Sequence, residues 1–123
     1  MLSHDGATLQ EVTHGYKNGS QGVPEGKSLV VLSGCAHAGI VNTVRQAQKV
    51  SGTERVHAIM GGCHLTNAKP ELIQSTVADI KAMKPDHIVP AHCSGFEAIV
   101  AFSREMPDAF TMNTTGTKYT YGA

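Results

Sequence analysis

The chain has 123 residues and a mass of 13.0 kDa, enough for one small domain with a core of its own. Its formal net charge is +0 and it has no basic run, which argues against nucleic acid as a partner. No apolar stretch approaches the length of a membrane span, the first residues lack a signal-peptide pattern, and an odd number of cysteines indicates free thiols. These features predict a cytoplasmic protein.

The predicted elements begin with a loose arm over residues 1–27, which is rich in Gly, Ser, Asn and His, with one short strand near Thr8–Val12. From residue 28 to residue 123 the pattern is that of one half-domain in which strands and helices alternate. Strands are predicted at 28–34, 55–62 and 87–92, and helices at 39–52, 70–84 and 96–106. A hairpin around Thr115-Gly116, formed by 109–113 and 118–122, is predicted to close the chain.

The predicted order β-α-β-α-β-α-β-β indicates an α/β fold with parallel strands joined by right-handed crossovers. The strand cores "LVVL" and "AIM" are apolar at successive positions, so both faces of the sheet need cover. The three helices could lie on one face or be divided between both. If they share one face, the other face needs a layer from elsewhere.

Each cysteine of the chain lies one or two positions from a histidine, directly after a predicted strand. The stretches are "LSGCAHAG" at 32–39, "MGGCHLT" at 60–66 and "VPAHCSG" at 89–95. The carboxyl ends of parallel strands meet at one edge of a sheet, so we expect His37, His64 and His92 to gather there. Three neutral imidazoles suit zinc, with iron or manganese as alternatives. The competing interpretation is that each histidine is an ordinary loop residue bonded to backbone.

The cysteines, the helix start at Gly39 and the other four histidines each have a structural interpretation beside a functional one. Cys35 and Cys93 are read as small buried hydrophobes, and Cys63 is a further candidate ligand. No C-x-x-C motif is present, so a thioredoxin-like role is not expected. Backbone N–H groups at Gly39 and Ile40 could receive an anion at a helix start, although ordinary turn chemistry explains the glycine equally well. The other histidines are read as structural or solvated: His4, His14, His57 and His87.

Three stretches resemble part of a known family. "LVVLSGCAHAGIVNTV", "HAIMGGCHL" and "IVPAHCSG" are similar to the second half of a branch of the metallo-β-lactamase superfamily, the dihydropterin-ribofuranosylaminobenzene-phosphate-synthase-like proteins. The resemblance covers residues 28–123. It implies half of an αββα sandwich with a one- or two-metal site at the rim, and by position its ligands would be His37, His64 and His92. Cys63 stands where the family pattern leads us to expect a bulky apolar residue.

The chain departs from the family pattern in one large respect. The His-x-His-x-Asp-His motif of the family's first half is absent, because no H-x-H occurs in the sequence. We therefore expect the family's ordinary mechanism, in which metal-bound water is activated, to be lost from this chain alone. The bare sheet face would be closed by a homodimer or by a separately encoded N-terminal half.

Three functions remain open at this point. One is a metal-dependent hydrolase half-domain with a His-rich rim. The second is a catalytically silent homodimeric binding or structural module, and the third, weaker one is an anion or nucleotide binder at Gly39. The sequence does not predict the substrate.

Overall fold

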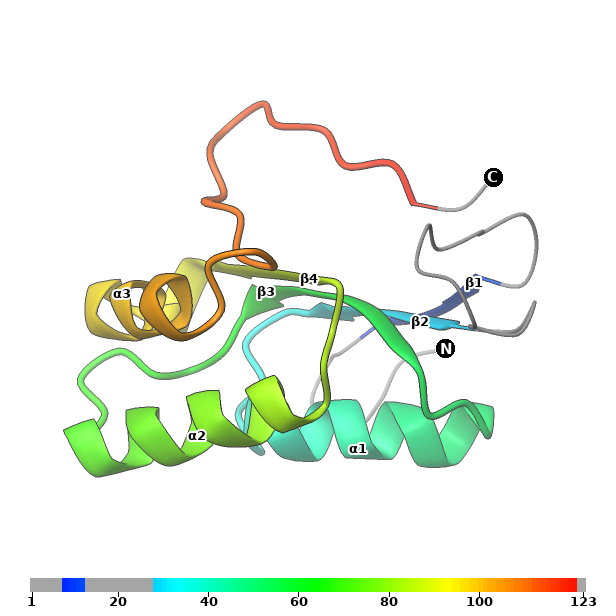
Figure 1. Cartoon of the computed structure of the whole chain (residues 1–123), viewed down its shortest axis with the longest axis horizontal. Helices are drawn as coiled ribbons and strands as arrows, with labels where there is room; N and C mark the ends of the chain where they lie inside the picture. The colour runs from blue at the N-terminus through cyan, green and yellow to red at the C-terminus, as the bar shows by residue number, and fades with distance from the viewer. Residues whose placement is uncertain (1–7, 13–27, 122–123) are drawn as a thin grey trace.

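A computed structural model describes residues 8–12 and 28–121 of the chain. Its elements in chain order are β1 (Thr8–Val12), β2 (Ser28–Ser33), α1 (Ile40–Ser51), β3 (Val56–Gly62), α2 (Pro70–Ala82), β4 (His87–Ala91), the 3-10 turn η1 (His92–Ser94) and α3 (Phe96–Glu105). The strands form one sheet in the order β1-β2-β3-β4 (Figure 1). The predicted α/β alternation is confirmed, since β2, β3 and β4 are parallel, and β1 joins the edge antiparallel to β2.

The predicted closing hairpin is wrong. Beyond α3, the described residues contribute only an isolated bridge between Ile88 and Phe110. The expected turn is present, because the N–H of Thr117 donates to the carbonyl of Thr114 at 3.1 Å, but no ladder flanks it. Threonine and tyrosine favour strands mainly through packing against neighbouring strands. Where the segment does not pair with a neighbouring strand, that preference has no effect.

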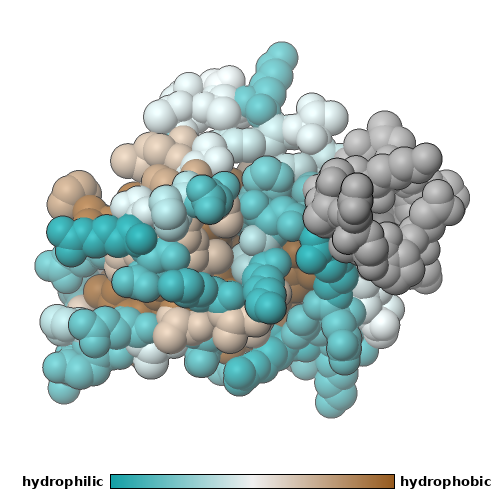
Figure 2. Space-filling view, in the orientation of Figure 1, coloured by the Kyte–Doolittle hydropathy of each residue, from teal (hydrophilic) through white to brown (hydrophobic). Residues whose placement is uncertain are grey.

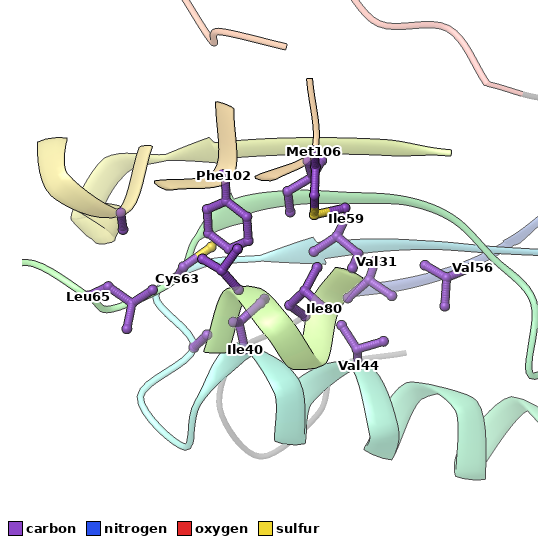
Figure 3. Packing of buried hydrophobic residues seen from close by; sticks show 14 of the residues in the cluster. Val31, Ile40, Val44, Val56, Ile59, Cys63, Leu65, Ile80, Phe102 and Met106 are labelled. Carbon is purple, nitrogen blue, oxygen red and sulfur yellow. The ribbon is translucent and has the colours of Figure 1, made fainter. Parts of the chain in front are cut away.

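All three helices contribute to one core on one face of the sheet. Side chains alternate along a strand, so Leu29, Val31, Ile59 and Ile88 point to the same side. Figure 1 shows α1 and α2 on this side of the sheet, and Figure 3 shows their side chains beneath the strands. The helices add these buried residues to the same cluster: Ile40, Val44, Ala47, Ile73, Val77, Ile80, Ala98 and Phe102. The choice left open by the sequence is thereby settled for the described helices.

The second face of the sheet is defined by Val30, Leu32, Ala58, Met60 and Val89. The C-terminal segment, residues 111–121, runs across this face on the side away from α1 and α2 (Figure 1). Two cavities of about 300 and 340 Å³ lie between the segment and the strands. Tyr121 packs with Val30 and Ala58, whereas Leu32 remains 37% exposed. Cover by a second copy or a separate chain stays a prediction.

The surface in the view of Figure 2 is mostly hydrophilic over the helix layer, and hydrophobic atoms appear mainly in the band between this layer and the sheet. This distribution agrees with amphipathic helices that bury one stripe against the strands. None of the described helices is both long and apolar enough to cross a bilayer.

Candidate metal centre

Three loops converge at the carboxyl ends of the parallel strands, as the βα pattern predicts. They are residues 34–39 after β2, 62–66 after β3 and 92–95 after β4. The backbone N–H groups of Leu65 and Thr66 both donate to the carbonyl of Cys93 at 3.1 Å. The Cys93 thiol in turn donates to the carbonyl of Cys35 at 3.4 Å. These bonds tie the three loops into one rim.

Glycine is required where these loops approach most closely. A Cβ atom on Gly62 would overlap the carbonyl oxygen of Gly34 and lie 2.8 Å from the sulfur of Cys93. Such a separation is well inside van der Waals contact, so any side chain at this position would push the loops apart. The absence of a side chain at Gly62 therefore creates the space that the Cys93 sulfur occupies.

Three donor side chains group together at this rim. The Sγ atoms of Cys35 and Cys93 and a ring nitrogen of His92 all lie within 4.8 Å of one another. Both thiols are half-buried and the imidazole is exposed, so an ion could enter from solvent. Desolvation, followed by the neighbouring Cys93 thiol, raises the pKa of Cys35. Two sulfurs and one imidazole are donors that suit a tetrahedral zinc ion with a fourth position open. The donor set therefore fits the metal that the family resemblance implies.

Three residues of these loops adopt left-handed backbone conformations although they are not glycine. Their φ values are 57° for Ala36, 50° for His64 and 51° for His92. Each such residue costs roughly 1–2 kcal/mol relative to an ordinary conformation. Strain of this kind persists where surrounding contacts impose it, and it gathers at functional sites. Here it sets the direction of two of the three predicted ligand histidines.

The structure divides the three predicted histidine ligands between two groups. His37 and His64 lie next to each other, with ring centroids 4.6 Å apart and planes inclined by 67°. His92 belongs to the group with Cys35 and Cys93. All three histidines are exposed at the same edge of the sheet. A coordination sphere made of these three imidazoles stays a prediction.

Cys63, the further candidate ligand, lies in the core. Its side chain is 2% exposed and packs in the cluster that contains Phe102 and Leu65 (Figure 3). Burial raises the pKa of its thiol to about 11. A metal ligand must be a thiolate, so this environment favours the role of a small hydrophobic residue.

The proposed anion site at the start of α1 also stays a prediction. The N–H of Gly39 already donates to the carbonyl of Ala36 at 2.9 Å, and its carbonyl accepts from the Thr43 hydroxyl. The first of these bonds occupies one of the two N–H groups that an anion would use.

The histidines read as structural lie elsewhere. Nδ1 of His57 is 2.8 Å from Oδ2 of Asp86, and the ring is 2% exposed. Its ring centroid lies 5.0 Å from that of His87, at the opposite end of β3 and β4 from the rim. Both fit a structural role, whereas His4 and His14 lie outside the described residues.

Sequence reasoning missed Cys35 and Cys93 as candidate ligands. The prediction that both are small buried hydrophobes is not met, because both are only partly buried and lie beside His92. The signal was available, because these cysteines follow strand ends as the histidines do. Their separation of 58 residues carries no such signal, so only the position after the strands places them at the same edge.

The sequence and the fold of the chain were compared with those of known proteins. No family model matches the chain. The chain is 40% identical over 84 residues to a protein of Methanocaldococcus jannaschii named 7,8-dihydropterin-6-methyl-4-(beta-D-ribofuranosyl)-aminobenzene-5'-phosphate synthase. The matched residues make up 68% of this chain and 29% of that protein. The crystal structure of a metal-dependent hydrolase of the β-lactamase superfamily superposes with a TM-score of 0.70 and 29% identity over 76% of this chain and 36% of the other.

The chain is similar in sequence and fold to proteins of the metallo-β-lactamase superfamily. The resemblance predicted from "LSGCAHAG" and its two counterparts is confirmed, including the dihydropterin branch. An uncharacterised protein of the same archaeon is 31% identical over 75 residues, which are 61% of this chain and 28% of that protein. The chain thus spans between 28% and 36% of the length of these three proteins.

Proposed function

We propose that this chain provides a divalent-metal site for hydrolysis of the metallo-β-lactamase type. The observation that supports the proposal most directly is the approach of Cys35, His92 and Cys93 to within 4.8 Å at the rim. The structural relative described as a metal-dependent hydrolase makes a metal the first ligand to test. Zinc is the ion we propose, because mixed sulfur and imidazole donors favour it over harder ions such as magnesium. The free thiols suit a reducing cytoplasm.

In this proposal the residues of the rim have separate tasks. Cys35, His92 and Cys93 hold the ion, and the loop bonds to the Cys93 carbonyl keep the two cysteines in place. A bound zinc ion would lower the pKa of water and polarise a substrate oxygen. The exposed pair of His37 and His64 supplies imidazoles at the same edge, as ligands in the family arrangement or as groups that accept and return a proton.

The substrate is left to experiment. One relative is named as a synthase and another as a hydrolase, so the names do not point to one reaction. Fold alone does not choose among substrates. We therefore propose the reaction class and the metal, with the alternative that the chain is a catalytically silent homodimeric module of the same fold.

Metal analysis of the untagged full chain tests the proposal. After incubation with zinc and removal of unbound ion, we expect near-stoichiometric zinc in the native chain. Cys35→Ser, Cys93→Ser and His92→Ala should each lower the zinc content at least severalfold. Two matched controls should retain zinc. Cys63→Ala changes a cysteine in the core, and His87→Ala changes a histidine at the other end of the strands.

The outcomes distinguish the donor sets. If His37→Ala and His64→Ala abolish binding while the two cysteine variants keep it, the imidazole set is the site and the cysteine assignment is wrong. If the native chain binds no zinc, iron or manganese, and chelator leaves its thermal unfolding unchanged, the silent module is favoured.

A further inference from the structure

We propose that Cys35 and Cys93 form a reversible disulfide across the rim, which makes the site sensitive to oxidation. The two Sγ atoms lie within 4.8 Å of each other, and the Cys93 thiol donates a hydrogen bond to the Cys35 carbonyl at 3.4 Å. A disulfide needs a sulfur–sulfur distance of about 2.05 Å, so the two side chains must rotate toward each other to close the remaining gap. Both sulfurs are half-buried, so an oxidant can reach them.

The sheet topology explains why these two residues meet. Cys35 follows β2 and Cys93 follows β4, and β3 lies between these strands. A side chain on the end of β3 would separate the two cysteines. Gly62 occupies that place, and its missing Cβ would lie 3.0 Å from the Cα of Cys35 and 2.8 Å from the sulfur of Cys93. The glycine thus opens the path between the two sulfurs.

The third cysteine is excluded by its surroundings. Cys63 packs in the helix-side core at 2% exposure, and its sulfur approaches the Gly61 carbonyl at 3.8 Å. The chain therefore carries one reactive thiol pair and one protected thiol, which serves as an internal reference.

The oxidation balances with a peroxide as the oxidant. One thiol loses its proton, and its sulfur attacks an oxygen of hydrogen peroxide to give a sulfenic acid; the hydroxide that leaves takes up that proton and becomes the first water molecule. The second thiol attacks this sulfur, the sulfur–sulfur bond forms, and the hydroxyl leaves as a second water molecule. The two thiols lose two protons and two electrons, and the peroxide is reduced. A dithiol or glutathione restores both thiols by exchange.

The disulfide itself does not depend on the proposed function, but its consequence does. A disulfide removes two of the three donors from the proposed metal site, so oxidation should release zinc and bound zinc should slow oxidation. Thiol chemistry on the metal-free chain and zinc content of the oxidised chain are therefore measured separately.

The test uses the metal-free full chain, reduced and then exposed to hydrogen peroxide. Cleavage after lysine and arginine, except before proline, places the three cysteines in peptides 28–45, 56–81 and 82–104. We expect the free thiols to fall from three per chain to one, with a cross-link between 28–45 and 82–104 that a dithiol reverses. Cys63→Ala should retain the cross-link, whereas Cys35→Ser and Cys93→Ser should each abolish it.

Other outcomes overturn the inference. These are three free thiols after peroxide, a cross-link that includes 56–81, or disulfides only between chains on a non-reducing gel. Preincubation with zinc should slow thiol loss several-fold. A cross-link that forms equally fast with zinc supports the disulfide and counts against Cys35 and Cys93 as zinc ligands, so the two proposals fail separately.

Discussion

Arg55 and Asp86 form an ion pair across the amino-terminal ends of β3 and β4. One guanidinium nitrogen donates to both carboxylate oxygens, at 2.8 and 2.9 Å. The same carboxylate lies 2.8 Å from Nδ1 of the buried His57. Asp86 therefore serves two partners on the neighbouring strand, and a charge-assisted network of this kind aligns the start of the parallel pair.

Asp86→Asn should destabilise the chain. The amide keeps the size of the side chain but removes the charge that both partners contact, which we expect to lower the free energy of unfolding by about 1–3 kcal/mol. Urea denaturation followed by circular dichroism measures the change. Lys81→Gln is the control, because Lys81 and Glu105 are both more than half exposed, and it should change stability by less than about 0.5 kcal/mol. Equal losses of stability in the two variants would show that the Asp86 carboxylate has no special stabilising role.

Stability should fall as the pH drops below neutrality, in part through His87. Desolvation lowers the pKa of His87, the nearby His57 lowers it further, and Asp86 opposes the shift. The unfolded chain then binds a proton near pH 6.5 that the folded chain accepts only at lower pH. The contribution of His87 to stability is complete at a pH above its pKa in the unfolded chain. It is lost as the pH falls toward its lower pKa in the folded chain.

Urea denaturation at several pH values between about 8 and about 5 tests this sign. His87→Asn should show a shallower loss of stability below pH 6.5 than the native chain. Parallel curves for the two proteins would show that His87 titrates alike in both states.

Gly61→Ala should be among the most destabilising single substitutions in the sheet. A Cβ at this position would overlap the carbonyl oxygen of Ser33, and the φ of 108° is unfavourable for any side chain. We expect a loss of at least about 2 kcal/mol. Gly52→Ala is the matched control, because Gly52 has a φ of 69° but nothing within 4 Å, so only the backbone cost of about 1 kcal/mol applies. Thermal unfolding compares the two, and a larger loss at Gly52 would refute the steric argument.

The homodimer stays a prediction that Leu32 can test. This side chain is 37% exposed on the second face of the sheet, next to both cavities. If a second copy covers this face, the native chain should sediment as a dimer at micromolar concentration, and Leu32→Glu should shift it to monomer. Leu72→Glu changes an exposed leucine of the helix layer and should leave the dimer intact. A native monomer would exclude this mode of closure at that concentration.

Much of the fold was readable from local pattern. The helix stripes, Pro70 at the start of α2 and Gly52 after α1 defined elements within one or two residues of those observed. The closing hairpin failed because strand formation depends on a partner, and residues 111–121 cross the sheet without joining its ladder. The side of the sheet that the helices cover also depends on packing, which the doubly apolar strands left undecided.

The edge of the sheet that carries the site was predicted from the sequence, but the grouping of side chains at that edge was not. Parallel strands place their carboxyl ends together whatever the loops do, so His37, His64 and His92 were found at one edge. The grouping of His92 with two cysteines depends on the left-handed residues and on the short turn η1, which no periodicity encodes. Single-residue loop conformations decide which atoms face one another, and these are not visible in the sequence.

The two ends of β3 carry unrelated chemistry. His57 and Gly62 are five residues apart, which is about 17 Å along an extended strand. Substitutions separated by more than about 10 Å generally combine additively. An engineer could therefore reinforce the ion-pair end against heat while remodelling the thiol end for a chosen ligand, and neither change should compromise the other.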